Sequence, residues 1–264
     1  MIDSHTHLSD EKFNQDRDDV INHCIKSGIK KFIEVLCSKD EWGKISLFDK
    51  YKENFFFSFG IHPHYTEQST DEDFKKLEEY ITTKRCVAIG ETGIDLWYYP
   101  DKLKEQLNLL EKQIEISNKT KKPLIFHIRN PKGSDRAYSS FFDFIPGKIN
   151  NGNYIPAVIH SFSGEINDAR KAIDMGFLIG INATITYPKN QSLREIIKNF
   201  GINSSIVETD CPYLPPQRIR GKRNDPTSII EIISAISEIT KMKYEDVEDK
   251  INSNFNLFLS KNYI

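Results

Sequence analysis

The chain has 264 residues, of which 38% are hydrophobic and 28% charged, and its formal net charge at pH 7 is −2. This composition excludes an intrinsically disordered chain, and the near-neutral charge excludes the global basic surface of nonspecific DNA-binding proteins. No apolar stretch reaches membrane-spanning length, and the four scattered cysteines form no CxxC pair, which is typical of reduced thiols. Met1-Ile2-Asp3 shows no signal-peptide pattern, and we expect a cytoplasmic monomer with no membrane partner.

Strand-like apolar runs recur along the chain at a fairly even pitch. The eight predicted strands cover residues 2–7, 31–36, 55–60, 86–91, 123–127, 155–160, 177–181 and 205–210. Several of these runs are continuously apolar, which is typical of parallel strands that are covered on both faces. The segment 212–223, rich in proline and arginine, is predicted to be the loop after the eighth strand.

Helical patterns fill the segments between the strands. Apolar stripes at helical spacing comprise Phe74, Leu77 and Ile81, then Leu103, Leu107, Leu110 and Ile114, and later Ile229, Ile232, Ile233 and Ile236. Asp225-Pro226 reads as an N-cap with proline at the first helical position, and a last helix is predicted over 244–259. Alternating strands and helices imply right-handed βαβ units. We therefore predict an α/β fold, a single (β/α)8 TIM barrel of the metallo-dependent hydrolase type over residues 1–264.

Five of the predicted strands end on residue types that bind divalent metals. They supply His5, His7, Glu91, His127, His160 and Asp210. The carboxyl ends of barrel strands meet on one rim, where barrel enzymes carry their active sites. Four imidazoles and two carboxylates exceed the three protein ligands of one catalytic zinc ion. We therefore predict two divalent metal ions per chain with Glu91 as the bridge: zinc, manganese or magnesium, the imidazoles favouring zinc, manganese or cobalt over magnesium.

The motifs around these positions resemble the TatD family of metal-dependent deoxyribonucleases, within the amidohydrolase superfamily. They are residues 3–8 (DSHTHL), 60–64 (GIHPH), 90–95 (GETGID), 126–129 (FHIR), 160–164 (HSFSG), 208–214 (ETDCPYL) and 223–226 (RNDP). The resemblance implies a barrel with a dinuclear site in which the six residues above match the ligand motifs. Ile128 departs from the small polar residue usual between His127 and Arg129, and Ser161 and Cys211 are milder departures; none removes a ligand.

A phosphodiester substrate also needs a base and positive charge. In this interpretation the ions hold and activate a water, Asp210 accepts its proton, and Glu91 bridges the ions, which makes both carboxylates catalytic. Arg129 and Arg223 are predicted to bind phosphate, although a solvated loop is the alternative for Arg223.

Two further groups of residues are candidates for substrate contact. His62 and His64 follow the third strand and are predicted substrate contacts, or else structural residues of a turn fixed by Pro63. Four aromatic residues either stack a terminal base or pack the rim; they are Trp97, Tyr98, Tyr99 and Tyr213.

The leading functional hypothesis is a metal-dependent deoxyribonuclease that hydrolyses DNA phosphodiester bonds. The resemblance implies 3′-to-5′ exonuclease action on single-stranded ends. The first alternative keeps the site but changes the bond, giving an ester hydrolase such as an aminoacyl-tRNA deacylase or a small-molecule amidohydrolase. The second is a metal-stabilised nucleic-acid-binding or scaffold protein without activity. Fold and metals alone do not separate the two enzymes, whereas the arginines do.

Overall fold

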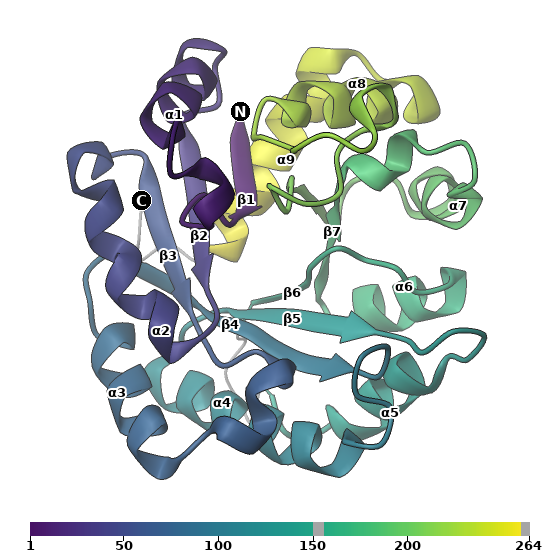
Figure 1. The fold of residues 1–264 in the computed structure, drawn as a ribbon. Helices are drawn as coiled ribbons and strands as arrows, with labels where there is room; N and C mark the ends of the chain where they lie inside the picture. Colours follow the sequence, from purple (N-terminus) through teal and green to yellow (C-terminus); the bar gives the residue numbers. More distant parts are fainter. Residues whose placement is uncertain (150–155, 260–264) are drawn as a thin grey trace.

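The computed structural model describes residues 1–149 and 156–259. Within them, eight parallel strands form one sheet in chain order (Figure 1). The strands are β1 (Ile2–Thr6), β2 (Lys31–Leu36), β3 (Phe55–Phe59), β4 (Cys86–Asp95), β5 (Leu124–Arg129), β6 (Ala157–Ile159), β7 (Leu178–Ile181) and β8 (Ser205–Val207). A parallel bridge between Thr6 and Cys211 connects the two ends of the sheet. The sheet is therefore a nearly closed barrel, and the predicted (β/α)8 class is confirmed.

The predicted strand ranges overlap the observed strands, with one consequential difference in β4. This strand was expected to end at Glu91 but continues to Asp95, pairing Gly93 with His127 and Asp95 with Arg129 of β5. The extension adds a second carboxylate to the same strand. Ile155, where the sixth strand was expected to begin, lies outside the described residues, and β6 begins at Ala157.

Helices surround the barrel (Figure 1). They are α1 (Arg17–Lys26), α2 (Lys39–Trp42), α3 (Asp71–Ile81), α4 (Leu103–Thr120), α5 (Arg136–Phe144), α6 (Ile166–Asp174), α7 (Gln191–Phe200), α8 (Ser228–Thr240) and α9 (Tyr244–Phe258). Short 3-10 helices are η1 (Glu11–Phe13), η2 (Gly43–Tyr51), η3 (Pro63–Gln68), η4 (Ala183–Thr186) and η5 (Gln217–Ile219). Among the described residues, no helix combines the length and hydropathy needed to cross a bilayer.

The predicted start of α8 was wrong by two residues. The N-cap is Thr227, and Asp225 precedes the helix in a turn in which its Oδ1 accepts the Thr227 N–H at 2.8 Å. The apolar stripe of this helix is as predicted, since Ile229, Ile232 and Ile236 are buried.

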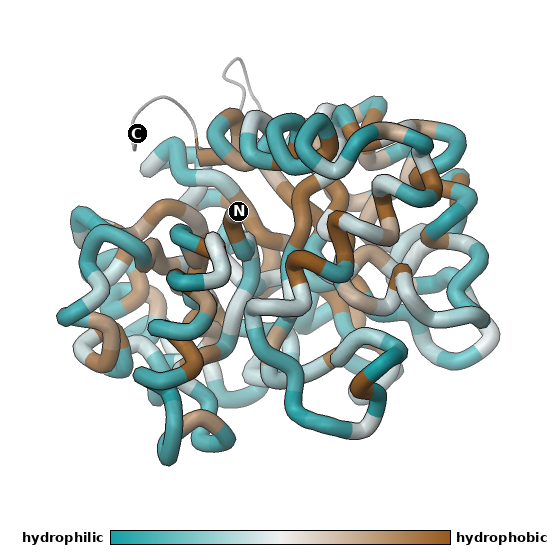
Figure 2. The backbone as a smooth tube through the Cα atoms, turned by 90° about the horizontal axis from the view of Figure 1, so that it is seen from above, coloured by the Kyte–Doolittle hydropathy of each residue, from teal (hydrophilic) through white to brown (hydrophobic). Residues whose placement is uncertain are grey.

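Two apolar layers hold the barrel together. The inner cluster joins strand residues such as Ile33, Val87 and Ile125 to Phe255 and Phe258 of α9. A larger cluster fills the space between the strands and the surrounding helices. Figure 2 shows the hydrophobic segments concentrated in the interior of the molecule and hydrophilic segments on the outer turns. Burial of both faces of the sheet explains why its strands are continuously apolar.

Candidate metal centre

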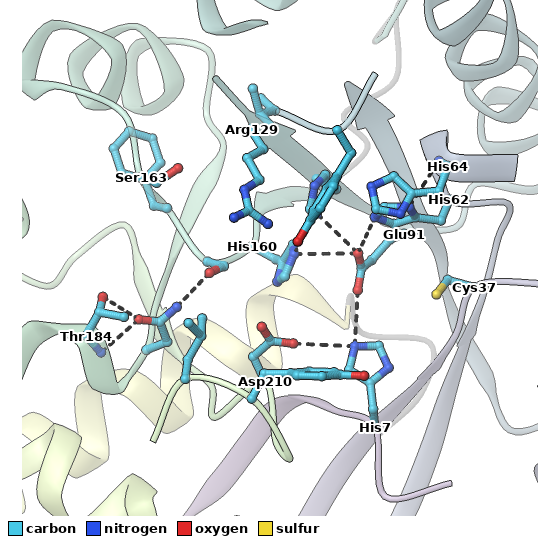
Figure 3. A pocket seen from close by; sticks show the side chains of 18 of the residues that line it. His7, Cys37, His62, His64, Glu91, Arg129, His160, Ser163, Thr184 and Asp210 are labelled. Atoms are coloured by element: carbon cyan, nitrogen blue, oxygen red, sulfur yellow. Dashed lines mark hydrogen bonds and ion pairs between the residues drawn. The ribbon is translucent and has the colours of Figure 1, made fainter. Parts of the chain in front are cut away.

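A cavity of about 940 Å³ opens at the carboxyl ends of the strands (Figure 3). Five of the six predicted ligands line it, namely His7, Glu91, His127, His160 and Asp210. The sixth, His5, is fully buried and contacts Glu91. The barrel therefore brings together residues from β1, β4, β5 and the segments after β6 and β8 on one rim.

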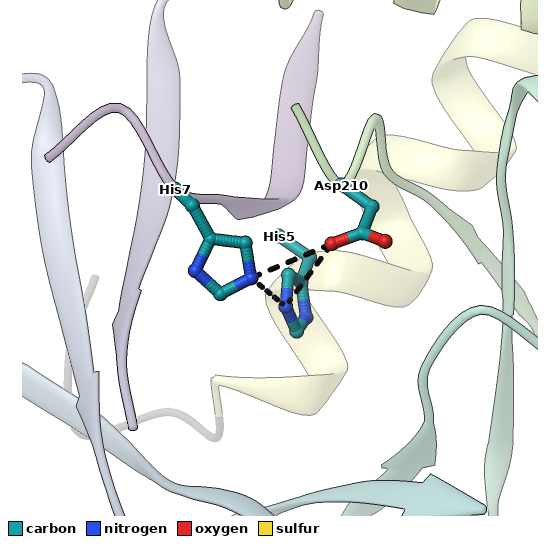
Figure 4. A group of neighbouring side chains, drawn as sticks. All are labelled: His5, His7 and Asp210. Carbon is teal, nitrogen blue, oxygen red and sulfur yellow. Dashed lines mark hydrogen bonds and ion pairs between the residues drawn. The ribbon is translucent and has the colours of Figure 1, made fainter. Parts of the chain in front are cut away.

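The first oxygen of Glu91 faces the two histidines of β1 and its extension. Glu91 Oε1 lies 2.7 Å from His5 Nε2 and 3.3 Å from His7 Nε2. Asp210 Oδ1 lies 3.4 Å from the same His7 nitrogen (Figure 4). Two imidazole nitrogens and the Asp210 carboxylate thus lie on one side of Glu91, and His5, His7 and Asp210 form a group that could hold a metal ion.

The second oxygen of Glu91 faces a different set of histidines. Glu91 Oε2 lies 3.3 Å from His127 Nδ1, 3.6 Å from His160 Nε2 and 3.3 Å from His62 Nε2. His127 and His160 approach one another to 3.3 Å. The two oxygens of the Glu91 carboxylate therefore face two different sets of imidazoles.

Hydrogen bonds on the far side of two imidazoles leave the inward nitrogen available as a ligand. His7 Nδ1 lies 3.1 Å from the carbonyl oxygen of Val35, and His127 Nε2 lies 3.1 Å from Asp95 Oδ2. Each of these acceptors requires a proton on the nitrogen that it contacts, so the lone pairs lie on His7 Nε2 and His127 Nδ1, which face Glu91. Such anchoring of the outer nitrogen is characteristic of metal-binding histidines, and the donor set fits divalent ions.

His62 differs from the other imidazoles of the cavity. Its Nδ1 accepts the backbone N–H of His64 at 3.2 Å, so the proton of the neutral ring is on Nε2, the atom facing Glu91. Burial, followed by the neighbouring His127, lowers the pKa of His62 to about 4. We therefore interpret His62 as a neutral hydrogen-bond donor in the cavity and not as a ligand.

The charge state of the centre favours cations. Burial acts to raise the pKa of Glu91, but the neighbouring imidazoles, His160 first, outweigh it and hold that pKa well below its usual range. Burial also acts to raise the pKa of Asp210, but the hydrogen bond from His7 and the neighbouring imidazoles together outweigh it and lower that pKa. Burial would lower the pKa of His160, yet Glu91 and Glu208 raise it to about 9. The negative charge of the ionised carboxylates thus stabilises either protonated imidazoles or a bound metal ion.

Asp210 reaches the cavity through an unusual backbone conformation. Its φ is 55°, in the left-handed region, and its N–H donates to the His5 carbonyl at 3.0 Å. Aspartate adopts this region more readily than most residues, and such outliers cluster at functional sites. The turn after β8 is therefore tied to β1, so that Asp210 lies beside His7.

Two carboxylates of the site were not predicted. Asp95 Oδ2 contacts His127 Nε2, and it also lies 2.8 Å from His64 Nε2. Glu208 accepts the Ser161 N–H, and it lies 3.5 Å from His160 Nδ1. Both had a signal in the sequence. Asp95 is at an even spacing from Glu91, which on an extended strand places both side chains on one face, and Glu208 directly follows the apolar run of β8.

The two predicted phosphate-binding arginines have different surroundings. Arg129 lines the cavity and extends into it above His160 (Figure 3). Arg223 is not among the lining residues, and both of its terminal nitrogens bind Asp16, at 2.8 and 2.6 Å. Its guanidinium also covers Phe13, 4.5 Å from the ring centroid. Arg129 therefore has the more direct access to the cavity, and the phosphate-binding role of Arg223 stays a prediction, with its charge paired to Asp16 in this structure.

The chain matches known proteins over nearly its whole length. The family model described as "TatD related DNase" matches residues 2–260. An uncharacterized metal-dependent hydrolase of Buchnera aphidicola is 31% identical over 268 residues, which cover 97% of each chain. Among solved structures, the TatD homolog YjjV of Escherichia coli has a TM-score of 0.86 at 22% identity, with 98% of this chain and 97% of its own covered. A TatD family hydrolase of Entamoeba histolytica has a TM-score of 0.84 at 22% identity, with the same coverage, 98% and 97%.

Proposed function

Because the chain belongs to the TatD related DNase family of metal-dependent hydrolases, we propose that it is a deoxyribonuclease trimming single-stranded DNA from the 3′ end. The observation that carries this proposal is the position of Glu91, whose two oxygens address two separate ligand sets beside the cavity. Paired ions are suited to in-line displacement at a phosphoryl group. We further propose that the enzyme acts as one domain and as a monomer.

The residues around Glu91 divide into two ligand sets. His5, His7, Asp210 and Glu91 would hold one ion, and Glu91, His127 and His160 would hold the other. Zinc, manganese or magnesium, when bound, supplies Lewis-acid activation of a water and of a phosphoryl oxygen.

The remaining chemistry falls to the side chains. The ionised Asp210 carboxylate, on the cavity wall, accepts a proton from the attacking water. The new bond forms between the water oxygen and phosphorus, the bond from phosphorus to O3′ of the preceding nucleotide breaks, and the proton passes to that O3′. Arg129 neutralises the non-bridging oxygens, and the Nε2–H of His62 donates a hydrogen bond within the cavity. The products are a 5′-mononucleotide and a shortened strand.

The charge distribution supports a short contact with the substrate. With a formal net charge of −2, the chain has no general attraction for the many phosphates of a duplex. A cavity of about 940 Å³ suits a few nucleotides at a strand end.

The direct test is a gel time course with a 5′-labelled single-stranded oligonucleotide. Reactions contain Mg²⁺, Mn²⁺ or Zn²⁺, or a chelator, and Glu91→Ala protein serves as the control for contaminating nuclease. We expect a metal-dependent ladder that shortens from the 3′ end and is absent with Glu91→Ala. An intact strand after incubation with wild-type protein that holds metal would contradict the proposal and direct the next assays to carboxylic esters.

A second test separates phosphodiester from neutral-ester chemistry. We expect Arg129→Ala to reduce DNA cleavage by about 10- to 150-fold, the cost of losing one charge-assisted hydrogen bond of 1.5–3 kcal/mol. Turnover of an uncharged ester should be nearly unchanged by the same substitution. Unchanged DNA cleavage by Arg129→Ala would overturn the phosphate-binding role of this residue.

A further inference from the structure

Three consecutive aromatic residues lie exposed beside the candidate centre. Trp97, Tyr98 and Tyr99, in the segment after β4, keep 46%, 58% and 41% of their surface in contact with solvent. Tyr98 and Tyr99 line the cavity, and each ring lies 5.1 Å from His64 between centroids. Exposed apolar groups that lie together at the rim of a site mark a surface for a ligand.

Arg129 joins these rings to the cavity. Its guanidinium carbon lies 5.2 Å from the centroid of Trp97 and 5.0 Å from that of Tyr98. Within the described part of the chain, Arg129 takes part in no ion pair, so its charge is available to an anionic ligand. A cation between two exposed aromatic rings is suited to a ligand that combines a phosphate with a flat base.

The aromatic segment is held rigidly in place. Asp95 Oδ1 accepts the backbone N–H groups of Trp97 at 2.9 Å and Tyr98 at 3.0 Å. The buried Gln106 donates to the Asp95 carbonyl at 3.1 Å. The other oxygen of the same Asp95 carboxylate contacts His127. One side chain therefore sets the position of the rings relative to the metal-ligand side of the cavity, which lowers the entropic cost of stacking.

We propose that Trp97 and Tyr98 form a stacking platform for the unpaired bases adjacent to the scissile phosphodiester. Arg129 binds the phosphate that links these bases. This inference rests on the proposed function and assigns the residues that recognise the unpaired bases of its substrate. A base inside a duplex is already paired with its partner and stacked on both faces, so the platform selects single strands. Stacking uses the face common to all bases, so selection is independent of sequence.

Tryptophan fluorescence tests the platform directly. The chain has two tryptophans. Trp42 is fully buried and donates to the Gly60 carbonyl, so a ligand bound at the exposed aromatic residues can contact only Trp97. We expect a five-nucleotide dT strand to quench the emission of Asp210→Asn protein, which lacks the proposed base and is expected to leave the strand uncut. An abasic strand of equal length, and the Trp97→Phe background, should give no quenching. Equal quenching by the abasic strand would overturn the stacking role.

Steady-state kinetics with wild-type chemistry provide the second test. Trp97→Ala and Tyr98→Ala should each raise KM for the oligonucleotide by about 5- to 150-fold, the measured range for one base–aromatic stack, and leave kcat nearly unchanged. Leu257→Ala, which removes a 67% exposed side chain on α9, is the matched control and should not alter KM. The substitutions should have no effect on KM for a strand with an abasic 3′ end.

The two proposals fail in different ways. No metal-dependent DNA cleavage by the wild-type protein would overturn the proposed function. Cleavage with a KM that Trp97→Ala and Tyr98→Ala leave unchanged would overturn the platform alone.

Discussion

At the scale of single residues, Asp95 shows how one buried carboxylate serves two parts of the site. Its Oδ1 accepts two backbone N–H groups of the aromatic segment, and its Oδ2 contacts His64 and His127. These contacts outweigh the effect of burial and lower the pKa of Asp95, so the group is ionised at neutral pH. An ionised acceptor keeps the proton of His127 on Nε2 and its lone pair on Nδ1.

Asp95→Asn should weaken metal binding without unfolding the protein. An amide offers one acceptor and one donor, so whichever way it is oriented, an NH₂ group faces either His127 Nε2–H or the backbone N–H groups. We expect the affinity for Zn²⁺ or Mn²⁺ to fall by about 10- to 100-fold, as is typical for partners of metal-binding histidines. Isothermal titration calorimetry measures this, with circular dichroism as the folding control, and an unchanged affinity would contradict the role of Asp95.

The imidazoles predict a pH dependence with a definite sign. His160, whose pKa is raised from 6.5 to about 9, must lose its proton before it can bind a metal. The apparent metal affinity should therefore increase as the pH rises from 6.5 towards 9, with protons released on binding near pH 7. The stability of the metal-free protein should instead decrease as the pH rises. The contribution of protonated His160 to stability is fully present below pH 6.5 and is lost towards pH 9. Calorimetry in buffers of different ionisation enthalpy counts the protons, and a buffer-independent enthalpy near pH 7 would refute the prediction.

At the scale of elements, β4 and β5 determine the centre of the site. β4 carries Glu91 and Asp95, and β5 carries His127, which pairs with Gly93. Gly93 has a φ of +149°, and a Cβ there would overlap the backbone carbonyl of His127. Glycine is therefore required where the two strands come closest, and this close approach places Asp95 within hydrogen-bond distance of His127.

Gly93→Ala should damage both stability and metal binding. The new methyl group would push β5 away and displace His127, and we expect a loss of more than about 2 kcal/mol in the free energy of unfolding. Gly133→Ala is a suitable control, because Gly133 has a φ of +74° but nothing within 4 Å of an added Cβ. The control should cost only about 1 kcal/mol, from its backbone conformation. Equal costs in denaturant melts would show that the contact with β5 is unimportant.

At the scale of the whole molecule, apolar burial extends through the entire barrel. The inner and outer clusters together include residues of every strand. A core of this extent does not need a metal to form.

Removal of metal should therefore have a limited effect on the fold. We expect a chelator to lower the melting temperature in proportion to the lost ligand-binding energy, while the metal-free protein keeps its far-UV circular dichroism and a cooperative transition. Loss of helical signal at 25 °C on chelation would contradict the prediction that the core forms independently.

The sequence alone determined the order of strands and helices, because apolar periodicity and chain connectivity are local properties. It also determined which residue types are available as ligands, since five strand-like runs end on histidine, glutamate or aspartate. Only the tertiary structure decided how these residues are paired. The Arg223–Asp16 ion pair joins residues 207 positions apart, and the hydrogen bond between His5 and Glu91 spans 86 positions. Hydrogen-bond partners, tautomers and burial depend on which distant segments the barrel places in contact. The contacts of Asp95 with His127 and of Arg223 with Asp16 could therefore be found only in the folded chain.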